Sequence, residues 1–313
     1  MTDRAEPAGN LGRICDHGGM DGDSFPLRLP DGRSIDVAVS GPDGAVPLLV
    51  HHGTPGSRAQ YPPFAAAAAA RGLRYVSWSR PGYGGSSRLP GRAVADCAAD
   101  TAAILDHLGA DHCYTLGASG GGPHALACAA LLADKVLACA TVAGVGPFAA
   151  DGLDFLEGMG RENHEEFGAA LAGPAPLQAY LKHEAGEFAD VSGEQIAAAL
   201  GDLVSPVDAA ALTGDFAAHM AASFHQAVAN GIWGWFDDDL AFTRPWGFDL
   251  RRIGVPVVVW QGGQDRMVPF THGRWLAAQL PAATARLLPD EGHLSIAVAK
   301  FGEIIDQLVE RAP

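Results

Sequence analysis

Ser119 has the most specific setting for chemistry of any residue in this chain. It lies in the run GASGG, residues 117–121, between the apolar stretch HCYTLG and an alanine-rich segment typical of a helix. A nucleophilic serine at such a strand-to-helix turn needs small neighbours, because the turn that exposes its hydroxyl is strained. The start of a helix also directs backbone N–H groups toward developing negative charge. The alternatives are an ordinary tight turn and a phosphate-binding loop, and the second fits poorly because no G-K-[ST] or G-x-G-x-x-G pattern is present.

A serine hydroxyl needs a base, and the base needs an acid that orients it. Asp265 follows the apolar run VPVVVWQGG, and His293 follows the next apolar run, TARLLP. The chain order Ser, Asp, His is the one used on open sheets with a serine at such a turn. Ligand sites on these sheets gather at the C-terminal ends of strands, so we expect the three side chains to lie together. Asp265 and His293 could each have a structural role instead. Asp265 could be a turn or N-cap residue, and His293 could cap the last helix.

The segment LLVHHGTPGS, residues 48–57, is expected to stabilise an oxyanion. An apolar run ends there in a loop, from which the backbone N–H of Thr54 can point at a carbonyl oxygen. The N–H of Gly120 would be the second donor. His51 and His52 are expected to order or underlie this loop, since the oxyanion does not need their ring nitrogens. We expect no metal and no cofactor, because adjacent histidines diverge and no H-E-x-x-H motif is present.

The elements that must position these residues alternate between strands and helices. Residues 25–41 predict a hairpin through the turn Pro30-Asp31-Gly32. Further strands are predicted from apolar runs, with helical patterns between them, at 46–53, 73–79, 112–117, 135–144, 255–263 and 284–289. This alternation predicts an α/β fold with a mostly parallel sheet and helices on both faces.

The alternation stops between residues 145 and 246, where helical patterns replace strands. We therefore predict one α/β core from residues 25–144 and 247–313, interrupted by a helical block at 145–246. Residues 1–24 are polar and glycine-rich and predict a mobile tail. They contain no apolar region of the kind that a secretory signal needs.

Composition narrows the class of partner. The 313 residues carry a net charge of −15, with 48% hydrophobic and 18% charged residues. Such a chain repels nucleic-acid backbones and anionic membrane surfaces, and no apolar run approaches the roughly 20 residues that span a bilayer. The five cysteines show no CxxC spacing and are expected to be buried thiols in the reducing cytoplasm. A small-molecule substrate is the expected partner, and the oligomeric state stays open.

Four motifs, taken in order, resemble those of the α/β-hydrolase superfamily: HHGTPG, SRPGYGGS, GASGGG, and the pair GGQD and EGH. The resemblance covers residues 25–312. HGTPG and RPGYGGS look like the proline iminopeptidase and related hydrolase branch. However, Thr54 and Ser79 stand where that branch usually has Gly and Asp, which counts against a peptidase. A serine at 119, where the dehalogenase and epoxide-hydrolase branches have an aspartate, argues against those branches.

The resemblance implies that the helical block forms a cap over the active site and lines the pocket. It also suggests that the Thr54–Pro55 peptide bond is cis. Aromatic residues of the block are expected to form an apolar substrate pocket, namely Phe148, Phe155, Trp233, Trp235 and Phe236.

The block also contains two acidic runs. Glu162, Glu165 and Glu166 could hold a substrate amine, as acidic cap residues do in iminopeptidases. We expect instead a solvated helix face that points away from Ser119. Residues 237–239, three aspartates, are expected to begin a helix rather than to bind a metal.

Together these features predict a cofactor-independent serine hydrolase that cleaves a small carboxylic ester or related acyl substrate through an acyl-enzyme. In this mechanism His293 deprotonates Ser119, and Asp265 orients the imidazole. The alternatives are an aminopeptidase resembling proline iminopeptidases, a hydrolase of C–C bonds, and a non-catalytic binding protein on the same fold.

Overall fold

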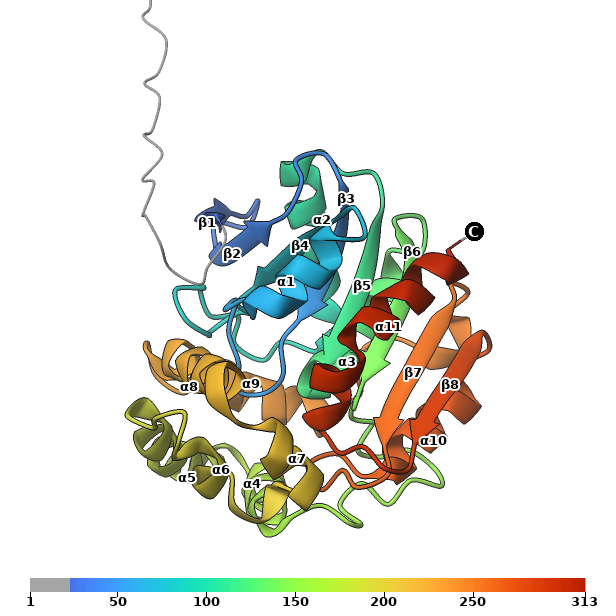
Figure 1. The fold of residues 1–313 in the computed structure, drawn as a ribbon. Helices are drawn as coiled ribbons and strands as arrows, with labels where there is room; N and C mark the ends of the chain where they lie inside the picture. Colours follow the sequence, from blue (N-terminus) through green and yellow to red (C-terminus); the bar gives the residue numbers. More distant parts are fainter. Residues whose placement is uncertain (1–22, 313) are drawn as a thin grey trace, which may run out of the picture.

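An eight-stranded sheet forms the centre of the protein (Figure 1). The computed structural model describes residues 23–312. The strands are β1 (Asp23–Arg28), β2 (Ser34–Ser40), β3 (Val46–His51), β4 (Leu73–Trp78), β5 (Cys113–Ala118), β6 (Val136–Val142), β7 (Val257–Gly262) and β8 (Ala283–Leu288). They lie in the order β1-β2-β4-β3-β5-β6-β7-β8; β2 is antiparallel to both neighbours and all other pairs are parallel. The predicted fold class is confirmed.

The hairpin at the sheet edge forms where the sequence predicts it, with Gly32 at a φ of +89° in its turn. Strand β1 begins at Asp23, two residues earlier than the predicted start of the core. Asp23 and Ser24 pair with Val39 and Ala38 of β2, so backbone pairing extends the strand into polar residues that the apolar pattern could not mark. The rest of the predicted tail, residues 1–22, lies outside the described residues.

Helices cover both faces of the sheet (Figure 1). One face packs against α2 (Cys97–Leu108), α3 (Gly122–Leu131) and α10 (Phe270–Gln279), and the other against α1 (Pro62–Ala69) and α11 (Ser295–Arg311). Strand β7 is buried along its whole length, which explains its nearly continuous apolar sequence. None of the helices within residues 23–312 is long and apolar enough to cross a membrane.

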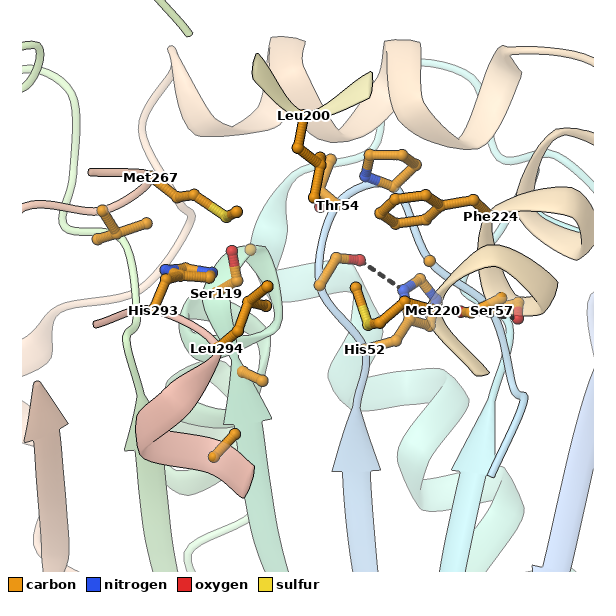
Figure 2. Close-up of a pocket in the computed structure, with 18 of the residues that line it drawn as sticks. His52, Thr54, Ser57, Ser119, Leu200, Met220, Phe224, Met267, His293 and Leu294 are labelled. Atoms are coloured by element: carbon orange, nitrogen blue, oxygen red, sulfur yellow. Dashed lines mark hydrogen bonds between the residues drawn. The ribbon is translucent and has the colours of Figure 1, made fainter. Parts of the chain in front are cut away.

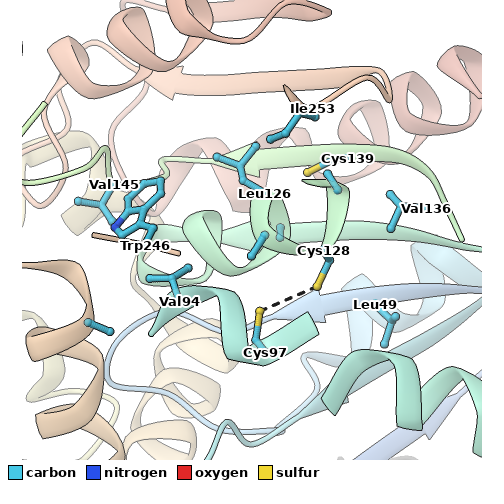
Figure 3. Close-up of a cluster of buried hydrophobic side chains, with 14 of the residues drawn as sticks. Leu49, Val94, Cys97, Leu126, Cys128, Val136, Cys139, Val145, Trp246 and Ile253 are labelled. Atoms are coloured by element: carbon cyan, nitrogen blue, oxygen red, sulfur yellow. Dashed lines mark hydrogen bonds between the residues drawn. The ribbon is translucent and has the colours of Figure 1, made fainter. Parts of the chain in front are cut away.

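The core between the sheet and α2 and α3 contains most of the cysteines (Figure 3). Cys97, Cys113, Cys128 and Cys139 are free and buried, as the sequence predicts. The fifth, Cys15, lies outside the described residues.

Six α-helices lie between β6 and β7: α4 (Arg161–Ala172), α5 (Pro174–Ala189), α6 (Ile196–Ala199), α7 (Pro206–Ala211), α8 (Gly214–Val228) and α9 (Trp233–Phe242). They have a hydrophobic core of their own, which includes Leu177, Leu181 and Phe224. In Figure 1 these helices lie beyond the arrowheads of the central strands, at the end of the sheet where β5 leads into Ser119. The division of the chain into a core and a cap stays a prediction.

Candidate active site

Ser119 lies in the turn between β5 and α3, with a φ of +54°. This left-handed conformation is unfavourable for a residue with a Cβ and persists only where the surroundings impose it. Gly117 and Gly121 make the turn possible. A Cβ on Gly117 would collide with the Gly121 carbonyl oxygen, and one on Gly121 would collide with that of His51. The small residues around Ser119 are therefore required by the close approach of neighbouring backbones.

Asp265 and His293 are hydrogen-bonded to each other, as the sequence predicts. His293 Nδ1 donates to Asp265 Oδ2 at 2.9 Å. The other carboxylate oxygen accepts the N–H groups of Met267 at 2.9 Å and Val268 at 2.8 Å. Asp265 is thus both a turn residue and the partner of the imidazole.

The imidazole of His293 faces Ser119, and both residues line one cavity (Figure 2). Among the residues that the structure describes, no hydrogen bond joins the Ser119 hydroxyl to this ring. Contacts of this kind often tighten only when a substrate is bound. The arrangement places a histidine oriented by a carboxylate next to an exposed hydroxyl, which suits transfer of the hydroxyl proton to the ring.

Burial lowers the pKa of His293, but the charge and hydrogen bond of Asp265 outweigh it and raise the pKa above the ordinary value of 6.5. A base must be neutral to accept a proton, so activity is expected to fall as pH drops through this raised pKa. We expect kcat/KM, measured between about pH 5 and 9, to fall close to tenfold per pH unit on the acid side, with a midpoint above 6.5. A profile that stays flat down to about pH 5.5 would rule out His293 as the base.

The loop that carries His293 is held by Asp208, a residue that the sequence did not single out. Asp208 belongs to α7 and is fully buried. Its carboxylate accepts the backbone N–H groups of His293 at 3.0 Å, Leu294 at 2.7 Å and Ser295 at 2.9 Å. The helical block therefore fixes the backbone of the candidate base and caps the start of α11.

The loop after β3 lies against the Ser119 turn. The Thr54–Pro55 bond is cis, as the resemblance to α/β-hydrolases suggested. A Cβ on Gly120 would collide with the Thr54 side chain, so the two predicted oxyanion donors are neighbours. His52 orders the loop as expected, with Nδ1 donating to the Gly53 carbonyl at 2.7 Å and Nε2 accepting the Arg80 N–H at 3.2 Å. The role of Thr54 and Gly120 as donors stays a prediction.

A buried ion network lies beneath this loop, centred on Asp238 of α9. Its carboxylate forms ion pairs with the guanidinium groups of Arg80 at 2.6 Å and Arg92 at 2.7 Å. It also accepts a hydrogen bond from the Tyr83 hydroxyl at 2.8 Å. It also accepts the Thr54 hydroxyl at 2.8 Å. Burial raises the pKa of Asp238, but the two arginines outweigh it and hold the pKa well below its ordinary value. Asp238 thereby connects the helical block to the loop that carries Thr54.

The expectation that the three aspartates begin a helix is wrong. Helix α9 starts at Trp233, and all three aspartates lie in its middle and are buried. Arginines supplied by distant parts of the chain compensate two of them, Asp237 through Arg88 and Asp238 through Arg80 and Arg92. Within residues 23–312 no group of three or more His, Cys, Asp or Glu is arranged to hold a metal ion.

A cavity of about 260 Å³ opens above Ser119 and His293. Its wall is mostly apolar and includes Phe188, Phe216, Phe224, Trp235, Phe242 and Met220. Of the aromatic residues predicted for the pocket, Trp235 lines this cavity. The others do not, because they pack elsewhere: Phe148 and Phe155 pack against each other, Trp233 lies under Arg88 and Phe236 packs on Trp233.

The acidic run on α4 differs from the solvated face that the sequence predicts. Glu165 is exposed, but Glu162 and Glu166 line the cavity. The Glu162 carboxylate is bonded to Arg161 and to the N–H of Asp202. Glu166 accepts the indole N–H of Trp235 at 2.7 Å. The expectation that these residues point away from the site is therefore wrong for Glu162 and Glu166, because the helix turns both toward the cavity.

The sequence and the structure of this chain are similar to those of known proteins with the same fold. The family model for the alpha/beta hydrolase fold matches residues 46–299, and the chain belongs to this family. It is 29% identical over 264 residues to a non-heme chloroperoxidase of Streptomyces lividans, covering 84% of this chain and 89% of the relative. It is 35% identical over 149 residues to epoxide hydrolase B of Mycobacterium tuberculosis, covering 44% of this chain and 40% of the relative. An esterase from Rhodococcus sp. ECU1013 has a similar structure, with a TM-score of 0.63, 21% identity, and coverage of 92% of this chain and 99% of that one.

Proposed function

We propose that this protein is a cofactor-independent serine hydrolase that cleaves a carboxylic ester or a related acyl substrate. In the first half of the reaction His293 takes the proton of the Ser119 hydroxyl, and the oxygen attacks the acyl carbonyl. The imidazolium, stabilised by Asp265, then protonates the leaving group. The leaving group departs, and the acyl group stays bound to Ser119 as an acyl-enzyme. In the second half His293 activates a water molecule that releases the acid and restores Ser119.

The negative charge that develops on the carbonyl oxygen is assigned to the backbone N–H groups of Thr54 and Gly120. Each such donor contributes about 3–4 kcal/mol to stabilisation of the transition state. The contact of Thr54 with the Ser119 turn, and its anchoring to Asp238, support this role. Fixed donors need no reorganisation when the charge appears, which is the source of their effect.

The observation that carries the proposal is the hydrogen-bonded pair of His293 and Asp265 facing Ser119 in one cavity. A non-catalytic binding protein would need no such pair. An aminopeptidase is the second candidate, because Glu166 lies at the wall of the same cavity and could meet a substrate amine.

The test is labelling with a fluorophosphonate probe, followed by a panel of esters of varied acyl length and of amino-acid anilides. We expect the folded protein to be labelled at Ser119 and to turn over esters. Turnover of anilides above every ester would favour the aminopeptidase. A folded protein that is neither labelled nor active would support the binding protein instead.

A further inference from the structure

Arg80 belongs to the SRPGYGGS motif, and the proposed mechanism gives it no role. Its side chain is 1% exposed, and its guanidinium group lies against the loop after β3. Nη1 donates a hydrogen bond to the carbonyl oxygen of His52 at 2.5 Å, and Nη2 donates one to the carbonyl oxygen of Gly53 at 3.0 Å. Two consecutive carbonyl groups of the loop therefore point at one buried positive charge.

The Gly53 carbonyl belongs to the same peptide unit as the Thr54 N–H, which is the first donor assigned to the oxyanion. This unit is trans and planar, so its C=O and N–H point in opposite directions. Thr54 lines the cavity, and Arg80 is not among the described residues that do. Because Arg80 holds the carbonyl on the buried side, the N–H is directed toward the cavity. A Cβ on Gly53 would lie 3.4 Å from the Cβ of Ser119, so this peptide unit is next to the candidate nucleophile.

The bonds to the Gly53 carbonyl also strengthen the Thr54 N–H as a donor. A peptide unit is polarised when its carbonyl oxygen accepts a hydrogen bond, and its N–H then donates more strongly. The same oxygen accepts a second bond, from His52 Nδ1 at 2.7 Å. Burial, and after it the Arg80 charge, hold the pKa of His52 well below its ordinary value, so the ring is neutral. Its one proton is on Nδ1, because a carbonyl oxygen can only accept.

The side chain of Thr54 is held by the same guanidinium group. Nη2 of Arg80 donates to the Thr54 hydroxyl oxygen at 3.0 Å, and that hydroxyl donates to Asp238 at 2.8 Å. Arg92 pairs with the same carboxylate at 2.7 Å, but its other hydrogen bond goes to the Gly234 carbonyl. Within residues 23–312, Arg80 bonds to both the loop and Asp238, whereas Arg92 makes no hydrogen bond to the loop.

We propose that Arg80 is a positioning residue for the oxyanion hole, which holds the Gly53–Thr54 peptide unit with its N–H directed at the substrate carbonyl oxygen and polarises that N–H. This inference rests on the proposed serine hydrolase function and adds to it a residue that acts through Thr54 without touching the substrate. The polarised donor matters most when the carbonyl oxygen becomes negative. Its effect therefore belongs to the transition state and falls on kcat more than on KM.

The experiment compares the same conservative substitution at the two arginines. Arg80→Lys keeps a positive charge for Asp238 but lacks the planar fork that bonds the carboxylate and both loop carbonyls at once. We expect kcat on the best ester of the panel to fall by at least about tenfold, with KM within about threefold of the wild type. Arg92→Lys is the matched control and should change kcat by less than about threefold.

The mobility of the Thr54 N–H measures its positioning without any turnover. In protein with isotope-labelled threonine, the Thr54 signal is identified by its loss in Thr54→Ser. Relaxation measurements by NMR should give this N–H an order parameter of about 0.85 in the wild type and in Arg92→Lys, and below about 0.6 in Arg80→Lys. A purely structural role of Arg80 elsewhere in the network would leave this value unchanged.

The two measurements separate this inference from the proposed function. A wild type that cleaves no ester, with the Thr54 N–H loosened only in Arg80→Lys, would overturn the hydrolase function and leave the positioning by Arg80 standing. An ordered Thr54 N–H in Arg80→Lys, a kcat loss no larger than in Arg92→Lys, or a change confined to KM would overturn the positioning role.

A second variant keeps the test decisive if Arg80→Lys does not fold. His52→Leu removes the other donor to the Gly53 carbonyl and leaves the ion pair of Arg80 with Asp238 in place. We expect it to lower kcat at least about threefold, again with little change in KM. A kcat equal to that of the wild type would show that bonds to this carbonyl do not affect the reaction, and would overturn the inference.

Discussion

Ser119→Ala is expected to lower kcat on the best ester of the panel by at least about 10³-fold and to abolish labelling by a fluorophosphonate. The physical reason is that the alanine methyl group cannot attack a carbonyl, so only the oxyanion donors and substrate binding remain. Alanine and serine have similar volume and the same Cβ, so the strained turn at a φ of +54° is kept. The variant should unfold at nearly the same temperature as the wild type.

Ser57→Ala provides the matched control. Ser57 also lines the cavity, but its hydroxyl is bonded to Ser223 and Gln226 of α8. Its removal should leave labelling intact and change kcat by less than about tenfold. If Ser119→Ala folds and still labels or turns over like the wild type, Ser119 is not the nucleophile.

The sequence predicts the fold and the candidate reacting residues because their signals are local. A buried strand reads as an apolar run, and the turn at Ser119 needs glycines within two residues on either side. Asp265 and His293 each follow such a run, and the C-terminal ends of parallel strands meet at one edge of the sheet. Their hydrogen bond therefore follows from topology, without knowledge of any distant contact.

The groups that support the site could not be predicted in this way, because their partners are distant in the chain. In the sequence Asp238 is one of three consecutive aspartates. Only the structure shows that Arg80, 158 residues away, packs against it. Asp208 lies 85 residues from the backbone N–H of His293 that it binds. Whether a carboxylate is solvated or buried depends on the segments that pack against it, and its neighbours in the sequence do not specify those segments.

Glu166 and Trp235 illustrate the same limit within the pocket. Glu165 and Glu166 are adjacent and chemically alike, yet the helix turns one to solvent and the other to the cavity. The direction depends on how α4 packs against α9, which no pattern in α4 specifies. Aromatic composition predicted an apolar pocket correctly, but only Trp235 of the five aromatics named lines it.

Asp238→Asn is expected to lower the free energy of unfolding by about 3–5 kcal/mol. The substitution keeps the size of the side chain and removes its charge, so the buried Arg80 and Arg92 lose the carboxylate that pairs with them. Both arginines are almost fully buried and cannot turn to solvent. Urea denaturation at neutral pH measures the loss, and a lower kcat is expected in the folded variant because Thr54 loses its charged acceptor.

The neighbouring Asp237→Asn separates this effect from a general sensitivity of α9. Asp237 is equally buried, but its partner Arg88 is 30% exposed and can be hydrated after the change. We expect Asp237→Asn to lower the free energy of unfolding by about 1 kcal/mol, close to the contribution of a surface ion pair. Equal destabilisation by the two variants would mean that the paired arginines are not what makes Asp238 necessary. A difference of several kcal/mol would show that the buried arginines Arg80 and Arg92 are what makes Asp238 necessary for stability.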